Sequence, residues 1–185
     1  MFINLFRKIG SSPKLLIGVL LLEIISVAFM MHKLNHVVMA FGAGAPPDFR
    51  FGYKPRDFYV WLEKIGPYGR KQYLDMVMWD LFPYMECYTL LIGSLLLKEC
   101  EVANRKIDMV MVMPFAMAFD VVETLLNGYV TLQFPHKVDD YMIVASSVAN
   151  QLKWISLGSG ALSLSLLFMH NHICHIYTVQ GKKSD

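Results

Sequence analysis

Charged residues are scarce in this sequence. Asp, Glu, Lys and Arg make up 17% of its 185 residues, against about 25% in an average soluble domain. The 17 Lys and Arg nearly balance the 15 Asp and Glu, so the formal net charge is only +2. A nucleic-acid-binding protein would carry a basic field. The composition therefore excludes a soluble enzyme and a nucleic-acid binder, and the length predicts a single domain spanning residues 1–185.

Cysteine is also rare, and recognisable reaction motifs are absent. The three cysteines, Cys87, Cys100 and Cys174, have no regular spacing and form no CxxC pair, which excludes a disulfide framework. The sequence contains no Walker loop, HExxH, GxSxG or glycine-rich dinucleotide motif. We therefore expect no cofactor, and a function other than catalysis is favoured.

The sequence is instead rich in long apolar segments, and hydrophobic residues make up 55% of it. A helix that crosses a bilayer needs about 20 mostly apolar residues. Segments of this kind run over about 15–39, 74–97, 107–134 and 141–177, and none shows the alternation of a strand. We predict an all-α fold, an integral membrane four-helix bundle. The short second and third connections favour antiparallel neighbours, and the last helix must tilt or project beyond the membrane.

The long connection between the first two helices contains a further predicted element. The run from Gly42 to Pro47 is incompatible with regular helix. Beyond it, apolar residues recur at helical spacing over about 56–65, namely Phe58, Trp61, Leu62 and Ile65. This pattern predicts a short amphipathic helix that ends at Gly66-Pro67. It would lie on the membrane surface or pack as a cap over the end of the bundle. In the first case we expect Trp61, Tyr68, Arg70 and Tyr73 to be interface anchors.

Ionisable residues interrupt the predicted spans. They are Glu23, Asp80, Glu86, Asp120, Glu123 and Lys153. Each costs about 2.5–3.5 kcal/mol at the centre of a bilayer on insertion scales. Five carboxylates cannot all stay ionised in hydrocarbon beside one ammonium group. Some must be protonated, lie near an interface or meet a partner.

Helical spacing groups several of these residues on facing surfaces. Asp120, Glu123 and Asn127 follow one stripe of the third helix, while Ser146, Asn150 and Lys153 follow one stripe of the fourth. Antiparallel packing would set the two stripes face to face. We therefore predict an intramembrane polar cluster of Asp80, Asp120, Glu123, Asn127, Asn150 and Lys153. Two interpretations are open. The cluster holds the helices together through interhelical polar contacts, worth on average about 0.6 kcal/mol per pair, or it forms a proton path, an ion path or a small-molecule cavity.

Histidines gather near the end of the fourth helix. His172 and His175 share one helical face, and His170 shares another with Cys174. Either pair could supply two metal ligands. However, no spacing matches a structural zinc motif and no third ligand is evident, so we expect no metal and name His170, His172 and His175 only as candidates.

Short motifs give the chain a resemblance to a known group of proteins. They are Gly52-Tyr53, Leu62, the run Gly66-Pro67-Tyr68-Gly69-Arg70-Lys71-Gln72-Tyr73, Asp80 and Pro83. The chain resembles an uncharacterised group of small four-span membrane proteins from bacteria and protists, which carry an LG-x-x-GR-x-x-Y element. Ile65 stands in place of the leucine of that element. Asp120, Glu123 and Lys153 match the acidic pair and the lysine of that group. The resemblance implies the four-span architecture and carries no activity.

Three functional hypotheses fit these features. The first is a non-catalytic accessory subunit of a larger membrane complex, with the mitochondrial inner membrane and an energy-transducing assembly favoured. Its partners would be membrane lipids and other membrane subunits, with no nucleic acid. The second is a small proton-coupled transporter or carrier that uses the charges inside the membrane. The third is an intramembrane lipid-modifying enzyme. A water-accessible cavity at the cluster would favour the second hypothesis, and a dry, closed contact would count against it.

Overall fold

The computed structural model describes residues 1–181, and of these all side chains except those of residues 37–40 and 174–181. Within this range the chain is helical and contains no strand. The α-helices are α1 (Phe2–Gly10), α2 (Pro13–Phe41), α3 (Pro55–Trp79), α4 (Met85–Val102), α5 (Val112–Gln133) and α6 (Asp140–Gly181). Shorter segments are η1 (Pro47–Phe49), η2 (Asp80–Tyr84) and η3 (Ile107–Met111).

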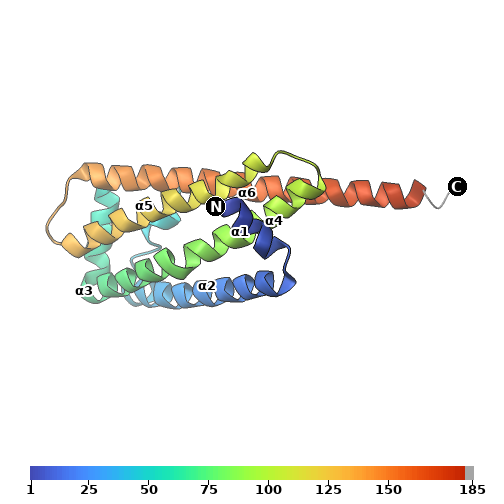
Figure 1. The fold of residues 1–185 in the computed structure, drawn as a ribbon. Helices are drawn as coiled ribbons and strands as arrows, with labels where there is room; N and C mark the ends of the chain where they lie inside the picture. The colour runs from blue at the N-terminus through green and yellow to red at the C-terminus, as the bar shows by residue number, and fades with distance from the viewer. Residues whose placement is uncertain (182–185) are drawn as a thin grey trace.

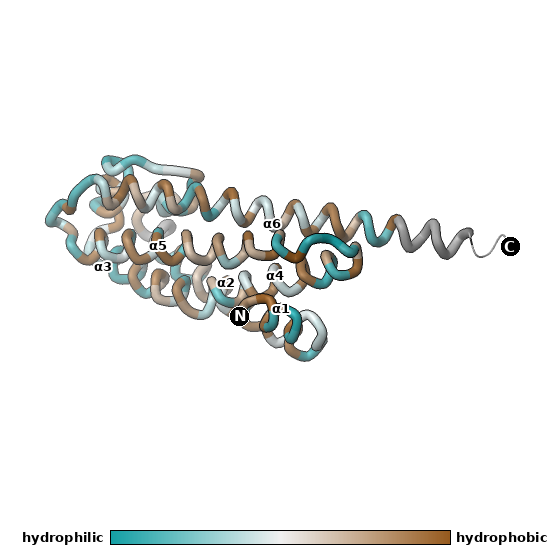
Figure 2. The backbone as a smooth tube through the Cα atoms, turned by 45° about the horizontal axis from the view of Figure 1, so that its top comes forward, coloured by the Kyte–Doolittle hydropathy of each residue, from teal (hydrophilic) through white to brown (hydrophobic). Residues whose placement is uncertain are grey.

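The long helices lie side by side and alternate in direction (Figure 1). α2 runs one way, the second half of α3 continues through η2 into α4 and runs back, and α5 and α6 follow as an antiparallel pair. The connections are more hydrophilic than the helices they join (Figure 2). α6 continues well beyond the ends of the other helices (Figure 1).

Three helical segments are long and apolar enough to cross a membrane. They are Pro13–His36, Ile107–Gln133 and Asp140–Ile173, with mean hydropathies of 2.3, 1.8 and 1.4. Their outward surfaces expose apolar side chains such as those of Ile25, Leu125 and Leu162. This is the pattern of helices that face lipid, so the chain has the features of a multi-pass membrane protein.

The predicted second span, 74–97, is not one continuous α-helix. It is divided between α3, the π-helical η2 and α4. Pro83 lacks a backbone N–H and cannot continue the ordinary ladder, and Phe82 has extended backbone angles. The charged residues Lys98, Glu99 and Glu101 near the end of α4 also lower its hydropathy. The region from the second half of α3 to the end of α4 is therefore not one of the three segments that are long and apolar enough to cross a membrane.

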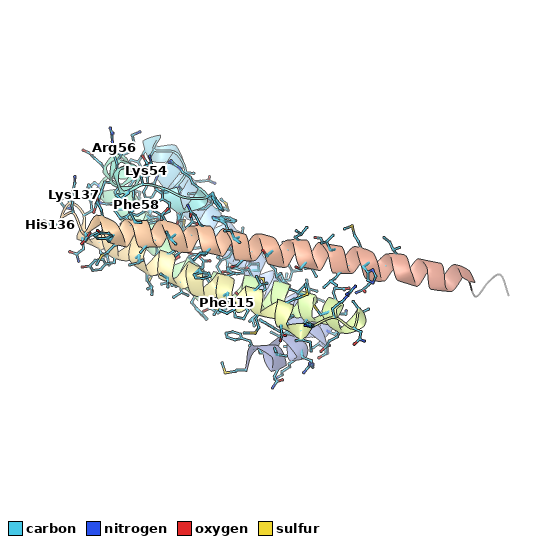
Figure 3. The ribbon with its side chains drawn as sticks, turned by 90° about the horizontal axis from the view of Figure 1, so that it is seen from above. Lys54, Arg56, Phe58, Phe115, His136 and Lys137 are labelled. Atoms are coloured by element: carbon cyan, nitrogen blue, oxygen red, sulfur yellow. The ribbon has the colours of Figure 1, made fainter. Side chains whose placement is uncertain are left out.

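The predicted helix over 56–65 forms the first part of α3. Gly66 interrupts α3 with a φ of 64°, a backbone conformation that glycine adopts without strain. Phe58, Trp61, Leu62 and Ile65 are buried against residues of the bundle such as Leu34, Val130 and Ile143. The apolar face therefore packs on the protein as a cap, and it is not free to insert into lipid. Lys54 and Arg56 lie at the same end of the molecule as His136 and Lys137 (Figure 3).

α1 packs against α4 at the other end of the bundle. Phe6 is fully buried there with Leu96, Leu97 and Cys100. The ring of Phe6 fits over Gly93, where an added Cβ atom would lie only 2.7 Å from Cζ of the ring. One apolar cluster thus lies under the first part of α3, and another lies between α1 and α4. The polar residues described below lie between them.

Candidate functional site

Lys153 and two buried carboxylates form the centre of the polar cluster. The Lys153 Nζ atom lies 3.1 Å from Asp120 Oδ1 and 2.5 Å from Glu123 Oε2. Asp120 and Glu123 are 2% and 1% exposed. Their spacing of three residues places both carboxylates on the face of α5 that meets α6. The lysine therefore has two carboxyl partners, which together compensate its charge.

The connection between α2 and α3 folds inward to reach this centre. Gly44 has a φ of 75° and lies in the turn that leads the chain back from the end of α2. The Asn150 amide donates a hydrogen bond to the Arg50 carbonyl. Asn150 lies ten residues into α6, a rise of about 15 Å along the helix. Residues 48–53 therefore run back along the bundle beside α6 instead of over its end, with the side chain of Tyr53 buried and those of Phe49, Arg50 and Phe51 exposed.

Tyr53 extends the cluster from this connection. Its hydroxyl lies 2.7 Å from Ser146 Oγ and 3.0 Å from Asn127 Oδ1, and its backbone N–H donates to Ser147 Oγ at 2.9 Å. Burial and the nearby Glu123 carboxylate raise the pKa of Tyr53, so its phenol stays a neutral hydrogen-bond donor. Sequence reasoning missed Tyr53 because the connection has no periodicity that would orient its side chains.

Two further carboxyl groups approach the cluster without a salt bridge among the described residues. Asp80 accepts a hydrogen bond from the Thr124 hydroxyl at 2.8 Å. Asp48 accepts one from the Tyr73 hydroxyl at 3.2 Å, and its Oδ1 atom is buried with no hydrogen-bond partner in the described part of the chain. Burial raises the pKa of Asp48, although the nearby Lys153 acts in the opposite direction. Asp48, like Tyr53, was not predicted from the sequence.

These groups surround a cavity of about 100 Å³ between the helices, room for several water molecules. Its polar wall consists of Asp48, Asp80, Asp120, Lys153, Tyr84 and Tyr88. Its apolar wall consists of Met30, Phe49, Met76, Trp154 and Leu157. The Tyr88 hydroxyl donates to Asp120 Oδ2 at 3.0 Å. Of the six residues predicted for the cluster, Asp80, Asp120 and Lys153 line this cavity. Glu123 is paired with Lys153, and Asn127 and Asn150 form hydrogen bonds with Tyr53 and Arg50 of the connection.

Three of the four residues expected as membrane-surface anchors make contacts within the protein. Trp61 is buried and donates from Nε1 to the Gly44 carbonyl at 3.1 Å, and Tyr73 is buried against Asp48. Arg70 donates to the Leu62 carbonyl at 3.0 Å, and its guanidinium lies over the ring of Phe134. Only Tyr68 among the four is largely exposed, at 57%. Trp61, Arg70 and Tyr73 therefore hold the cap and the inward connection in place.

The histidines near the end of α6 lie far along the helix from the cavity. His172 Nδ1 is 3.2 Å from the Phe168 carbonyl, and its ring packs on that of Phe168. The side chain of His175 lies outside the described residues, and His170 has an interaction of its own. The described side chains include no group of three His, Cys, Asp or Glu residues placed to hold a metal ion.

Comparison with known proteins adds no family to this description. No protein-family model, no curated protein and no solved structure matches the chain. The chemistry of the cavity must therefore be inferred from its own geometry: buried carboxyl groups in excess over one lysine, next to an apolar wall.

Proposed function

We propose that this chain is a small proton-coupled membrane carrier whose substrate site is the cavity beside Lys153. One observation carries the proposal: Asp48 and Asp80 line the cavity without a salt bridge among the described residues, while Lys153 is already paired with Asp120 and Glu123. An ion pair that only fixed the register of α5 and α6 would need neither the cavity nor the two additional carboxyl groups.

The excess of carboxyl groups supports proton coupling. An ionised carboxylate away from water is unfavourable unless a proton or a cation compensates it. The hydroxyl groups of Tyr73 and Thr124 donate to Asp48 and Asp80, and neither carboxyl group has a salt bridge among the described residues. A proton taken up at either group can therefore be exchanged for a positively charged substrate, or released when the site meets water.

The carrier is proposed to cross the membrane four times. α2, α5 and α6 contain the three apolar segments. The second half of α3, with η2 and α4, runs alongside them (Figure 1). Its interruption at Pro83 is compatible with a span, because irregular backbone is tolerated at membrane depth where it lines a cavity, and Asp80 and Tyr84 of η2 do so.

Proton flux across vesicles tests this function. The purified chain is reconstituted into liposomes that contain a pH-sensitive dye, and a pH gradient is imposed with the membrane potential clamped. We expect protein-dependent proton movement that slows strongly in Glu123→Gln and Lys153→Met. The exposed neighbours on the cap give matched controls, Glu63→Gln and Lys64→Met. Flux no faster than in protein-free vesicles, or equal loss in the control variants, would contradict the carrier.

The outer surface of α6 favours a second candidate, the accessory subunit of a larger membrane complex. Exposed apolar residues Leu162, Leu166 and Phe168 lie on the turns whose other face packs against α1 and α4, and beyond these turns α6 passes the ends of the other helices (Figure 1). A neighbouring subunit could cover this surface, in the mitochondrial inner membrane or in another membrane. Gentle extraction followed by a native gel distinguishes the two: a fixed place in a large assembly supports the subunit, and a species near 21.2 kDa excludes it.

A further inference from the structure

An apolar groove on the surface shares part of its lining with the polar cavity. A second hollow of about 330 Å³ is lined by Phe49, Phe51, Trp154 and Ile155. Phe49 and Trp154 also line the polar cavity, so the two spaces adjoin. All four groove residues are about half exposed. A molecule that occupied both spaces would have a polar head between the helices and an apolar chain against the outer surface of α6.

The charges in the cavity define the head group. Lys153 repels a cation only weakly here, because Asp120 and Glu123 compensate it. Asp48 and Asp80 then leave the cavity with an excess of acceptors, and the buried Oδ1 atom of Asp48 lacks a donor among the described residues. A carboxylate or phosphate head would face these groups at a large electrostatic cost. The cavity is complementary to a head group that donates hydrogen bonds and carries a positive charge.

Aromatic rings beside the carboxyl groups favour an organic cation over a metal ion. Tyr84, Tyr88 and Trp154 line the cavity, and aromatic faces attract alkylated ammonium groups. The Lys153 ammonium already lies 5.5 Å from the centre of the Trp154 ring. By contrast, the described residues contain no group of three metal-ligating side chains. An alkylammonium head can use separate carboxyl groups and rings that a compact metal ion cannot reach together.

We infer that this site binds an amphipathic amine, with the ammonium head at Asp48 and Asp80 and the apolar chain in the groove between Phe51 and Trp154. The inference rests on the proposed carrier function, since it names the substrate class of the same cavity. It is nevertheless testable by binding alone, without transport.

Three probes built on a six-carbon skeleton isolate the contribution of the head group. They are N,N-dimethylhexylamine, hexanol and hexanoate, which are cationic, neutral and anionic at neutral pH. Binding to the full chain in maltoside micelles is measured by titration calorimetry, with empty micelles as the blank. We expect saturable binding of the amine only. Binding of hexanoate, equal binding of all three probes, or no binding of the amine would overturn the inference.

Substitutions locate the amine within the site. Asp48→Asn and Asp80→Asn are made singly, and each removes a carboxyl group without changing the shape of the side chain. In Asp48→Asn, the amide oxygen would still accept a hydrogen bond from Tyr73. Each variant is expected to weaken amine binding about tenfold or more, because each removes one of the two carboxyl groups that would face the ammonium charge. Glu63→Gln is the matched control and leaves binding unchanged. Should either Asp variant fail to fold, Trp154→Ala at the exposed mouth gives the second test. Unaltered amine affinity in Trp154→Ala and in every folded Asp variant would contradict the position assigned to the amine in the cavity and groove.

Binding and flux are independent readouts. Amine binding without proton flux in vesicles would remove the carrier and keep the amine site. Proton flux in vesicles without amine binding in micelles would keep the carrier and remove the amine as its substrate.

Discussion

At the scale of single residues, Tyr53 joins the inward connection to the cluster. Its hydroxyl contacts Ser146 Oγ and Asn127 Oδ1 in a buried setting. Tyr53→Phe removes these hydrogen bonds and leaves the ring in place, so we expect a loss of about 1–2 kcal/mol in unfolding free energy. Thermal unfolding in detergent measures it as a lower midpoint.

Tyr68→Phe is the control for this prediction, because Tyr68 is largely exposed. Its midpoint is expected to stay unchanged. If Tyr53→Phe unfolded at the wild-type temperature, the hydroxyl would not stabilise the fold, and the inward path of residues 48–53 would lose its main anchor.

The residue scale also shows what the sequence could and could not predict. The contact of Lys153 with Asp120 and Glu123 follows from helical spacing and antiparallel neighbours, which are both visible in the sequence. Asp48 and Tyr53 lie in a connection rich in glycine and proline. Such a segment has no repeating geometry, so nothing local indicates that it turns into the bundle instead of away from it. The sequence offered two weak signals, the excess of carboxyl groups over Lys153 and the Gly52-Tyr53 motif, and neither assigns a role to the Tyr53 side chain.

At the scale of elements, the packing of α1 on α4 depends on the close approach of Phe6 to Gly93. A Cβ atom at position 93 would lie 2.7–2.9 Å from three atoms of the buried Phe6 ring. The ring cannot move without disturbing Leu96 and Cys100 beside it. Gly93→Ala is therefore expected to cost about 1–3 kcal/mol by overpacking, seen as a lower unfolding midpoint and faster proteolysis at Arg7 and Lys8.

Gly18 provides the matched control in a neighbouring helix. A Cβ atom there would meet no other atom within 4 Å, and alanine is the better helix former. Gly18→Ala is expected to leave the midpoint unchanged or raise it. A similar loss in both variants would show that the effect comes from the substitution itself and not from contact between α1 and α4.

Element boundaries were predictable where the mean hydropathy of a segment is high over its whole length. The helices expected over 15–39 and 141–177 correspond to α2, Pro13–Phe41, and α6, Asp140–Gly181. The one expected over 107–134 begins as η3 and continues as α5 to Gln133. The prediction of the second helix was less accurate, because apolar composition does not show that the helix is interrupted at Pro83, where Phe82 has extended backbone angles. That interruption carries Asp80 and Tyr84 to the cavity.

At the scale of the whole molecule, the number of crossings depends on the pass formed by α3, η2 and α4. If this pass spans the membrane, Lys8 and Arg105 lie on one side and Lys137 lies on the other. If it stays on one side, only α2, α5 and α6 cross, and Lys8 then shares its side with Lys137 while Arg105 lies opposite. All three side chains are exposed, so they can report the difference.

We expect the first pattern, because the cavity requires Asp80 of this pass at the depth of Asp120 and Lys153. Lys8→Cys, Arg105→Cys and Lys137→Cys are introduced singly into a chain carrying Cys174→Ser and reacted with an impermeant maleimide in sealed vesicles. Cys87 and Cys100 are buried and contribute only a background, which the chain without an added cysteine measures. Labelling of Arg105→Cys from the same side as Lys8→Cys supports four crossings. Labelling of Lys137→Cys from that side instead would place α3 and α4 outside the bilayer, and a cavity walled by Asp80 could then not be a site within the membrane.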